Sequence, residues 1–452
     1  SGASRVPTAS GIPAPPTRTS ATSLAPPSRT QRLALMALEI TAARPDPALL
    51  DLPWRIPLEE WPEDLLAALP RGISRHVVRF VRLSGRVLAV KEIKADIAQR
   101  EYEMLRNLGR MDMPCVEPFA VVSGRVAEDG TELDACLITV HLQFSLPYRA
   151  LYSQSLRKGT ATRLIDALAV LLVRLHLAGF WWGDVSLSNT LFRRDAGAFA
   201  AYLVDAETGE LRPRLSDGQR EHDLEIARVN IAGELMDLEA GGLLQEDRDP
   251  VEVSARIVSR YRELWDALTG SQLIADEERW RVDDRIRSLN ALGFDVDELA
   301  ITTDIDGTSI QIQPKVVDSG HHSRRLLRLT GLDVRENQAR RLLNDLDAYT
   351  AGTGRQGEDE TIVAHDWLTH VYEPVTRRVP RELVTKLEPA EVFHEVLEHR
   401  WYMAERAQHD IPIEDAIDDY VRSILPGKPD EQAVLGIDTQ QLPVIAKSKG
   451  RG

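Results

Sequence analysis

The feature that most constrains this chain is a group of three polar residues spread over a short stretch of loop and strand. Asp184 lies in the stretch Trp181-Trp-Gly-Asp-Val, Asn189 follows five residues later, and Asp205 ends the apolar run Ala201-Tyr-Leu-Val sixteen residues beyond Asn189. Amide and carboxylate oxygens are hard donors, which suit Mg²⁺ or Mn²⁺ and not zinc. Asn189 and Asp205 therefore offer the kind of oxygen atoms that such an ion prefers.

A β-hairpin and a helix are predicted upstream of this group. Apolar residues alternate from Val77 to a Ser84-Gly85 turn, and the next run ends in Val87-Leu-Ala-Val-Lys91. This period of two residues is typical of paired strands. The apolar spacing over residues 97–108 indicates a helix, and two further strands are expected around residues 116–123 and 135–142.

The rest of the chain up to about residue 292 has the pattern of a helical lobe. A long helix is expected to end near Gly179, and helices resume after Gly218. A small N-terminal sheet with one helix, followed by a larger helical part, predicts the α+β fold class in two lobes. The longest apolar run, residues 165–182, contains Asp166, Arg174 and His176, so we expect a buried core helix there and not a membrane span.

The order of these elements resembles the protein-kinase-like fold, with a small β-rich N-lobe and a helical C-lobe. Lys91 is similar to the strand lysine that clamps the α- and β-phosphates of ATP. Glu101 is similar to the helix acid that pairs with this lysine, and it fits better than Glu103 because it precedes Met104 by three residues. The resemblance implies a nucleotide-binding pair, Lys91 and Glu101.

The same resemblance assigns roles to the three polar residues of the loop and strand. It implies that Asp184 is catalytic and orients or deprotonates an acceptor hydroxyl, with Lys91 as the second catalytic residue. It also implies that Asn189 and Asp205 hold Mg²⁺ against the phosphates of ATP, which are otherwise too negative to approach one another closely. Each residue alone also fits an ordinary structural role, as a strand-edge lysine, a solvated helix charge, a strand-end cap or a loop pair.

The resemblance covers about residues 70–290 and is closest to the bacterial lipopolysaccharide kinase (Kdo/WaaP) branch, whose catalytic loop is a short Gly-Asp with an asparagine downstream. Gly183-Asp184 and Asn189 match that loop. The whole chain, including the stretch from Leu329 to Asp345, resembles an uncharacterised actinobacterial family in which this kinase-like domain precedes a C-terminal domain of unknown function. That family supplies no substrate.

Several positions depart from the kinase pattern. Trp182 replaces the usual histidine of the catalytic loop, and Ser186 stands where protein kinases carry a lysine, which disfavours a protein Ser/Thr kinase. Asp205 is followed by Ala-Glu and not Phe-Gly, and no Ala-Pro-Glu follows. Only Gly72 and Gly85 lie between Pro70 and Lys91, so the glycine-rich loop is missing and the phosphates need another backbone turn.

One further acid is a candidate for supporting the catalytic loop. Asp223, in Glu221-His-Asp-Leu-Glu, lies on a helix after the loop, where kinases place a buried supporting acid. A plain solvated charge is an equally good interpretation of this residue from the sequence.

The region after residue 298 is predicted to be a separate, mostly helical module. A strand pair is expected around Asp306-Gly307, then a basic helix over residues 323–349, and helices over residues 366–425. We expect the module to govern the choice of partner or substrate. Its aromatic residues fit either a contact surface or the core of the module, namely Trp367, Tyr372, Trp401 and Tyr402.

The predicted domains follow from these divisions. They are a disordered Pro/Ser/Thr-rich tail at 1–30, an N-terminal extension with the N-lobe at 31–145, the C-lobe at 146–298, the C-terminal α+β module at 299–426, and a flexible tail at 427–452. Within the extension, residues 31–45 are expected to be helical, and Trp54 and Trp61 to be packing anchors.

Composition limits the partners. The chain has 452 residues and a formal charge of −15, which disfavours nucleic acid, although a basic helix at 323–341 leaves that partner open as the weakest alternative. Its 2 cysteines are too few for a secreted disulfide framework, and no signal peptide pattern begins the sequence, so we expect a cytoplasmic protein.

Two functions fit these observations. The first is an ATP- and Mg²⁺-dependent phosphotransferase acting on a hydroxyl of a sugar, a lipid-linked molecule or another small acceptor, with Mn²⁺ as an alternative ion. The second is a nucleotide-binding, pseudokinase-like module that recruits a protein partner through residues 299–426. The polar residues that match kinases favour the first function, whereas the missing glycine-rich loop and Trp182 favour the second.

Overall fold

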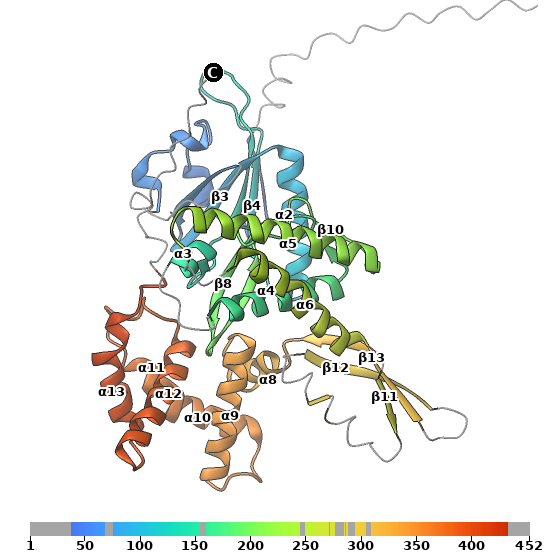
Figure 1. Cartoon of the computed structure of the whole chain (residues 1–452). Helices are drawn as coiled ribbons and strands as arrows, with labels where there is room; N and C mark the ends of the chain where they lie inside the picture. Colours follow the sequence, from blue (N-terminus) through green and yellow to red (C-terminus); the bar gives the residue numbers. More distant parts are fainter. Residues whose placement is uncertain are drawn as a thin grey trace, which may run out of the picture.

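The computed structural model describes residues 38–67, 76–153, 160–244, 249–270, 272–275, 284, 286–287, 294–303 and 309–432. Figure 1 shows a β-rich lobe, a helical lobe below it, and a further helical region at the end of the chain, with a small sheet beside it. The predicted tail at 1–30, and all of the predicted tail at 427–452 except residues 427–432, lie outside the described residues.

The N-lobe is a five-stranded antiparallel sheet with the strand order β1-β4-β5-β3-β2. Its strands are β1 (Glu39–Ala42), β2 (Val77–Leu83), β3 (Arg86–Ile93), β4 (Pro118–Ser123) and β5 (Ala135–Val140). The predicted hairpin is confirmed: Ser84 and Gly85 have φ angles of 48° and 78°, which a tight two-residue turn between twisted strands requires. Helix α2 (Ala95–Arg110) also confirms its prediction and packs Tyr102 and Leu105 inward.

The prediction of a helix over residues 31–45 was wrong for its described part. Residues 39–42 form β1, in which Ile40 lies opposite Val122 of β4. This segment forms a strand because the edge of β4 offers backbone hydrogen bonds, and these outweigh its local helix propensity. Short 3₁₀ turns follow β1, namely η1 (Pro47–Asp51), η2 (Leu58–Glu60) and η3 (Glu63–Leu65). Trp54 and Trp61 are buried against each other there, as predicted.

The C-lobe is built around one buried helix, α4 (Thr160–Leu177), which confirms the predicted core helix. It packs against α6 (Pro250–Thr269) and strand β9, and α5 (Asp217–Ala240) packs against α6. The other short elements are β6 (Leu146–Pro147), α3 (Tyr148–Ser153), β7 (Phe180–Trp181) and β10 (Glu210–Leu211). Among the described residues, no helix has both the length and the apolar character needed to cross a membrane.

A hairpin of β8 (Thr190–Asp195) and β9 (Ala198–Leu203) lies on the face of α4. Its register pairs Thr190 with Leu203 at the open end and Asp195 with Ala198 at the tip. Asn189 immediately precedes β8, and Asp205 follows β9 by two residues. The hairpin therefore holds the two predicted metal ligands at its open end, and we call this end the mouth.

A second sheet links the C-lobe to the C-terminal module. Strands β11 (Gln272–Ala275) and β12 (Phe294–Thr303) both pair with β13 (Ser309–Ser319). The predicted strand pair is therefore confirmed, and its turn at Asp306-Gly307 lies outside the described residues. β11 corrects the prediction that helices continue to about residue 292. Since residue 298 lies inside β12, we propose that the module begins before this strand, in the segment after α6.

The module itself is helical and has its own core. The predicted basic helix is divided at Gly331 (φ 77°) into α8 (His321–Thr330) and α9 (Glu336–Gly352). The remaining helices are α10 (Glu360–Trp367), η5 (Leu368–Tyr372), α11 (Glu373–Arg377), α12 (Pro389–Ala407), α13 (Ile413–Ser423) and η6 (Leu425–Gly427). Trp367 and Tyr372 are buried in the core of the module, whereas Trp401 and Tyr402 are exposed, so a contact surface stays a prediction for the latter two.

The tip of the β8–β9 hairpin is embedded in this module. The buried carboxylate of Asp195 accepts hydrogen bonds from the backbone N–H groups of Asn337 (3.2 Å) and Gln338 (2.8 Å), at the first turn of α9. Glu391 of α12 accepts the N–H of Ala196 at 2.9 Å. Figure 1 shows β8 reaching from the helical lobe toward α9. One hairpin therefore connects the mouth to the module.

Candidate active site

Lys91 lies at the centre of the site, between the two lobes. Its Nζ is 3.1 Å from Oε2 of Glu101 on α2 and 2.7 Å from Oδ2 of Asp205. The sequence predicted the first of these ion pairs, and the structure contains it. β3 places Lys91 here because its strand alternation turns Leu88 and Val90 into the core and Lys91 to the other face.

The electrostatics of this group are those of a buried, shared charge. Burial opposes the charge on Lys91, but the carboxylates of Glu101 and Asp205 outweigh it and raise the pKa of Lys91 above its ordinary value. Burial, together with the charge of Asp205, raises the pKa of Glu101 to about 7, although Lys91 acts in the opposite direction. The single positive charge of Lys91 is thus shared by two carboxylates. The remaining negative charge favours the binding of a further cation.

The loop with Asp184 and Asn189 is tied together by its own side chains. The Nδ2 of Asn189 donates to the carbonyl oxygen of Asp184 at 3.0 Å and to its Oδ2 at 3.1 Å. These bonds turn the amide nitrogen of Asn189 toward Asp184, so its amide oxygen points away from Asp184. The N–H of Val204 also donates to the carbonyl of Asn189 at 3.0 Å, so the backbone just before β8, with Asn189, and the backbone just after β9, with Asp205, are held together at the mouth. The donors present fit a Mg²⁺ or Mn²⁺ ion.

Asp223 supports this loop from α5, and the structure decides between the two interpretations of this residue. It is fully buried and accepts the N–H groups of Trp182 at 2.7 Å and Gly183 at 2.8 Å, and it lies 3.1 Å from Nε2 of His176. Gly183 has a φ of 76°, a conformation that glycine adopts without strain. Asp223 is therefore the buried acid under the loop. Trp182 is fully buried too, and its Nε1 donates to the carbonyl of Asp205 at 2.9 Å.

Two more residues of α5 hold the loop, and the sequence analysis missed both. Asn230 donates from Nδ2 to Oδ1 of Asp184 at 3.3 Å and to the carbonyl of Val185 at 3.1 Å. Glu234 accepts the N–H groups of Leu187 at 2.7 Å and Ser188 at 2.9 Å. Residues 223, 230 and 234 share one helix face, so this polar stripe was the signal that could have identified them.

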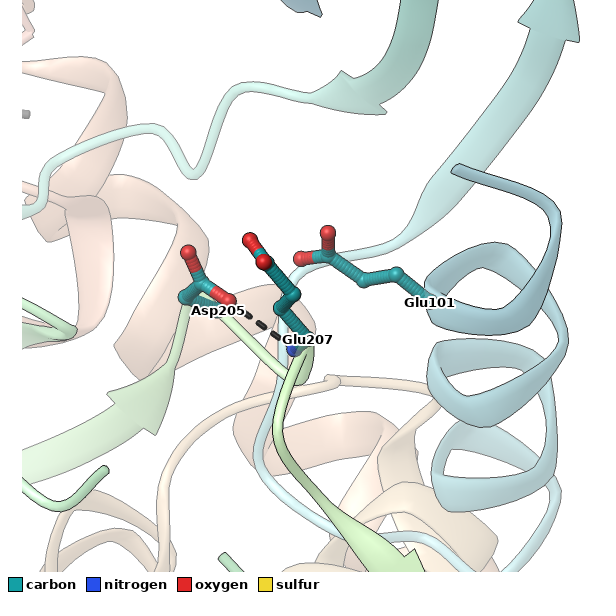
Figure 2. A group of neighbouring side chains, drawn as sticks. All are labelled: Glu101, Asp205 and Glu207. Carbon is teal, nitrogen blue, oxygen red and sulfur yellow. Dashed lines mark hydrogen bonds between the residues drawn. The ribbon is translucent and has the colours of Figure 1, made fainter. Parts of the chain in front are cut away.

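Glu207 is the other residue that the sequence analysis did not assign to the site. Figure 2 shows the carboxylates of Glu101, Asp205 and Glu207 turned toward a common space, with one oxygen of each within 4.8 Å of the others. Glu207 lies 3.5 Å from the Nζ of Lys91 and 3.1 Å from the Nε2 of His76. The residue that replaces the usual glycine of the metal motif therefore adds a third carboxylate beside Lys91.

Comparisons with known proteins agree with this geometry. Residues 83–232 match the lipopolysaccharide kinase (Kdo/WaaP) family, and residues 263–425 match a domain of unknown function (DUF4032). The first match lies in the kinase-like part of the chain, and the second begins within α6 and covers the C-terminal region. The fold of the chain is kinase-like, with an N-terminal antiparallel sheet, a helical C-lobe and an additional helical C-terminal region.

A solved structure titled "WaaP in complex with acyl carrier protein" is similar to part of the chain. It shares 16% sequence identity, covers 56% of this chain and 99% of its own, and has a TM-score of 0.33. No curated protein matches the chain.

Proposed function

We propose that this protein is a phosphotransferase that moves the γ-phosphoryl group of ATP to a hydroxyl of a sugar, a lipid-linked molecule or another small acceptor. The observation that carries the proposal is the ion pair between Lys91 and Glu101 with Asp205 at hydrogen-bond distance, which is the arrangement that a phosphate clamp needs. The match of residues 83–232 to the Kdo/WaaP kinase family supports the reaction class.

The reaction follows from the positions of these residues. The acceptor oxygen attacks the γ-phosphorus, the bond from this phosphorus to the β,γ-bridging oxygen breaks, and ADP leaves. Asp184 orients the hydroxyl and receives its proton, while Asn230 and Asn189 hold its carboxylate in place. Lys91 releases part of its contact with Asp205 and binds the α- and β-phosphates.

A divalent cation bound by Asn189 and Asp205 would neutralise the phosphate charge. These two residues flank neighbouring strands at the mouth, and both offer oxygen ligands. Mg²⁺ is the expected ion, and Mn²⁺ has the same ligand preference. Residues 68–75, which precede β2, lie outside the described residues.

We also propose the cytoplasm as the compartment, because it supplies ATP and keeps thiols reduced. Cys115 and Cys136 are both free cysteines. Burial raises the pKa of both thiols to about 12, so neither is a reactive thiolate at neutral pH.

The test is to measure the thermal shift and the ADP release of the full chain with ATP and MgCl₂. We expect a shift that EDTA removes, slow ADP release without an acceptor, and faster release when sugars and lipid-linked sugars are added in turn. Lys91→Ala should weaken ATP binding by about tenfold or more, because a charge-assisted contact to phosphate is lost. Unchanged ATP affinity in this variant would refute the clamp.

A second candidate is the pseudokinase-like module that recruits a partner through its C-terminal region. The specific observation in its favour is Glu207, whose carboxylate lies near Lys91 and competes with a phosphate for that cation. An ATP-induced thermal shift without ADP release, across all acceptors tried, would support this candidate over the phosphotransferase.

A further inference from the structure

A buried histidine lies behind the loop that carries Asp184, and the proposed reaction does not use it. His176 is in the last turn of α4, and its side chain is fully buried. Its Nε2 is 3.1 Å from Oδ2 of Asp223 on α5, and its Nδ1 is 2.7 Å from the hydroxyl of Tyr261 on α6. Each ring nitrogen therefore has one partner, and the two partners belong to different helices.

Asp223 decides which nitrogen of His176 carries the proton. Its Oδ2 accepts the N–H of Trp182 at 2.7 Å, and its Oδ1 accepts that of Gly183 at 2.8 Å. A carboxylate only accepts hydrogen bonds, so the Nε2 that faces it has to donate. Burial lowers the pKa of His176 below its ordinary value, although Asp223 acts in the opposite direction. The ring is therefore neutral at neutral pH, with its proton on Nε2 and a lone pair on Nδ1.

Tyr261 is the donor that this lone pair needs. Burial raises the pKa of Tyr261 above its ordinary value, so the hydroxyl keeps its proton. Arg220 of α5 is hydrogen-bonded to the same hydroxyl. Because a guanidinium only donates, the hydroxyl oxygen accepts from Arg220, and its proton is left for His176. Glu221 of α5 also acts on Tyr261, but it is paired with an arginine of α6.

Packing holds the ring of Tyr261 in place. The ring is almost fully buried, meets the His176 ring edge to face at a centroid distance of 5.3 Å, and stacks on Trp265 at 5.7 Å. Arg220 in turn lies over the Trp265 ring, 4.1 Å from its centroid. Tyr261→Phe keeps the ring for these contacts and removes only the hydroxyl. This substitution therefore separates the hydrogen bond from the packing.

We propose that Tyr261 is a positioning residue for the loop that carries Asp184. Its hydroxyl fixes the proton of His176 on Nε2, this N–H orients Asp223, and Asp223 holds the two backbone N–H groups just before Asp184. Tyr261 lies behind the loop and acts only through these contacts. The effect on turnover rests on the proposed function, whereas the effects on the histidine and on the loop do not.

Nitrogen NMR of the full chain with ¹⁵N-labelled histidine tests the first of these contacts. We expect the signal of His176, identified by its loss in His176→Gln, to show a neutral ring protonated at Nε2 at neutral pH. Tyr261→Phe removes the donor and leaves the Nδ1 lone pair buried and unpaired, which costs free energy. The ring should then take up a second proton or shift to the Nδ1–H form, and the two nitrogen shifts report either change.

Amide hydrogen exchange tests the effect on the loop. The N–H groups of Trp182 and Gly183 should exchange about threefold to tenfold faster in Tyr261→Phe, because Asp223 loses an oriented donor and holds them less firmly. ADP release from ATP with MgCl₂ should slow by a similar factor at an unchanged KM for ATP, since the loop and not the nucleotide clamp is disturbed. Wild-type protein that releases no ADP would refute the phosphotransferase, while the NMR and exchange measurements still decide this proposal.

A second variant separates this contact from a general folding defect. His176→Gln presents an amide N–H to Asp223, and an amide keeps this donor whether or not Tyr261 has a hydroxyl. In the His176→Gln background, Tyr261→Phe should therefore leave the exchange of the loop unchanged. An increase as large as in the wild-type background would mean that Tyr261 acts through packing, and it would overturn the proposal.

Tyr420→Phe is the matched control. Tyr420 is as deeply buried as Tyr261, and its hydroxyl donates to Glu395 at 2.6 Å within the module, so both variants lose a hydrogen bond that a buried tyrosine donates. The control should leave the His176 signal, the exchange of the loop and ADP release unchanged. A wild-type His176 that is protonated on both nitrogens at neutral pH would overturn the proposal. So would a Tyr261→Phe variant that keeps the wild-type signal and exchange.

Discussion

The two ends of the β8–β9 hairpin differ in how their carboxylates are compensated. At the mouth, Lys91 is shared by Glu101 and Asp205, and Glu207 adds a third carboxylate nearby. At the tip, Asp195 is fully buried, and its carboxylate accepts hydrogen bonds from three donors of residues 337 and 338. At the mouth, three carboxylates surround one lysine, so the negative charge exceeds the positive charge there. At the tip, the carboxylate of Asp195 is hydrogen-bonded to backbone and side-chain donors and joins the hairpin to the C-terminal region.

This difference changes how the C-terminal region is understood. Residues after 298 were expected to form a module that stands apart from the kinase-like domain. Arg194 and Glu431 form a salt bridge of 2.5 Å, and Arg335 donates to the carbonyl of Arg194 at 2.8 Å, so both early and late residues of this region bind the hairpin. The C-terminal region therefore helps to hold the β8–β9 hairpin, whose other end is the mouth.

The largest effect is expected at the mouth, from Asp184→Asn. The substitution keeps the size of the side chain and one oxygen acceptor, but it removes the group that receives the hydroxyl proton. General-base contributions of this kind are typically about 10²–10⁴-fold in rate, so turnover should fall by that factor while ATP affinity stays nearly the same. ADP release and ATP titration measure the two quantities, and a variant with full turnover would remove Asp184 from the mechanism.

The next effect is expected at the tip, from Asp195→Ala. It leaves the N–H groups of Asn337 and Gln338 buried without an acceptor, which should lower the free energy of unfolding by about 2–4 kcal/mol. Denaturant unfolding of the full chain measures the loss. Asp217→Ala changes an exposed carboxylate of α5 and is the control.

The same Asp195→Ala variant tests whether the two ends are independent. The mouth is also held by α4 and by Asp223, Asn230 and Glu234, so ATP affinity should change by less than about threefold in the folded variant. A loss of ATP affinity without a loss of stability would mean that the tip controls the mouth directly.

Sequence alone predicts the mouth far better than the tip, and the reason is physical. Lys91, Glu101 and Asp205 are recognisable because kinase-like proteins carry these residue types in a fixed order along the chain. The backbone partners of Asp195 lie 142 and 143 residues away along the chain, so no local sequence pattern predicts them. β1 shows the same limit, since residues 39–42 become a strand only because the edge of β4 is available.

The pH dependence of stability distinguishes the mouth from an ordinary ion pair. The pKa of Glu101 is raised to about 7 in the folded chain, above the ordinary value of 4.5, mainly by burial. The folded chain therefore holds this proton more tightly than the unfolded chain does. The contribution of Glu101 to stability is fully present below pH 4.5 and is lost as the pH rises through 7.

Glu101→Gln should remove this dependence. Between pH 5 and pH 8, the free energy of unfolding of the wild type should fall relative to that of the variant, by on the order of a few kcal/mol. Denaturant unfolding at the two pH values measures it. A difference that does not vary with pH would show that Glu101 is charged throughout, with Lys91 as a fully compensating partner.

The smallest effect is expected from Glu207→Gln, and it sharpens the description of the mouth. Glu207 is 3.5 Å from Lys91 and a quarter exposed, so its ion pair contributes at most about 1 kcal/mol to stability. Its carboxylate competes with phosphate for the same cation, so its removal should tighten the binding of ATP without Mg²⁺ by a few-fold. With Mg²⁺ the gain should shrink or reverse, because the ion loses a nearby negative charge. ATP titrations with MgCl₂ and with EDTA separate the two cases, and weaker binding in EDTA would instead make Glu207 a residue that positions Lys91.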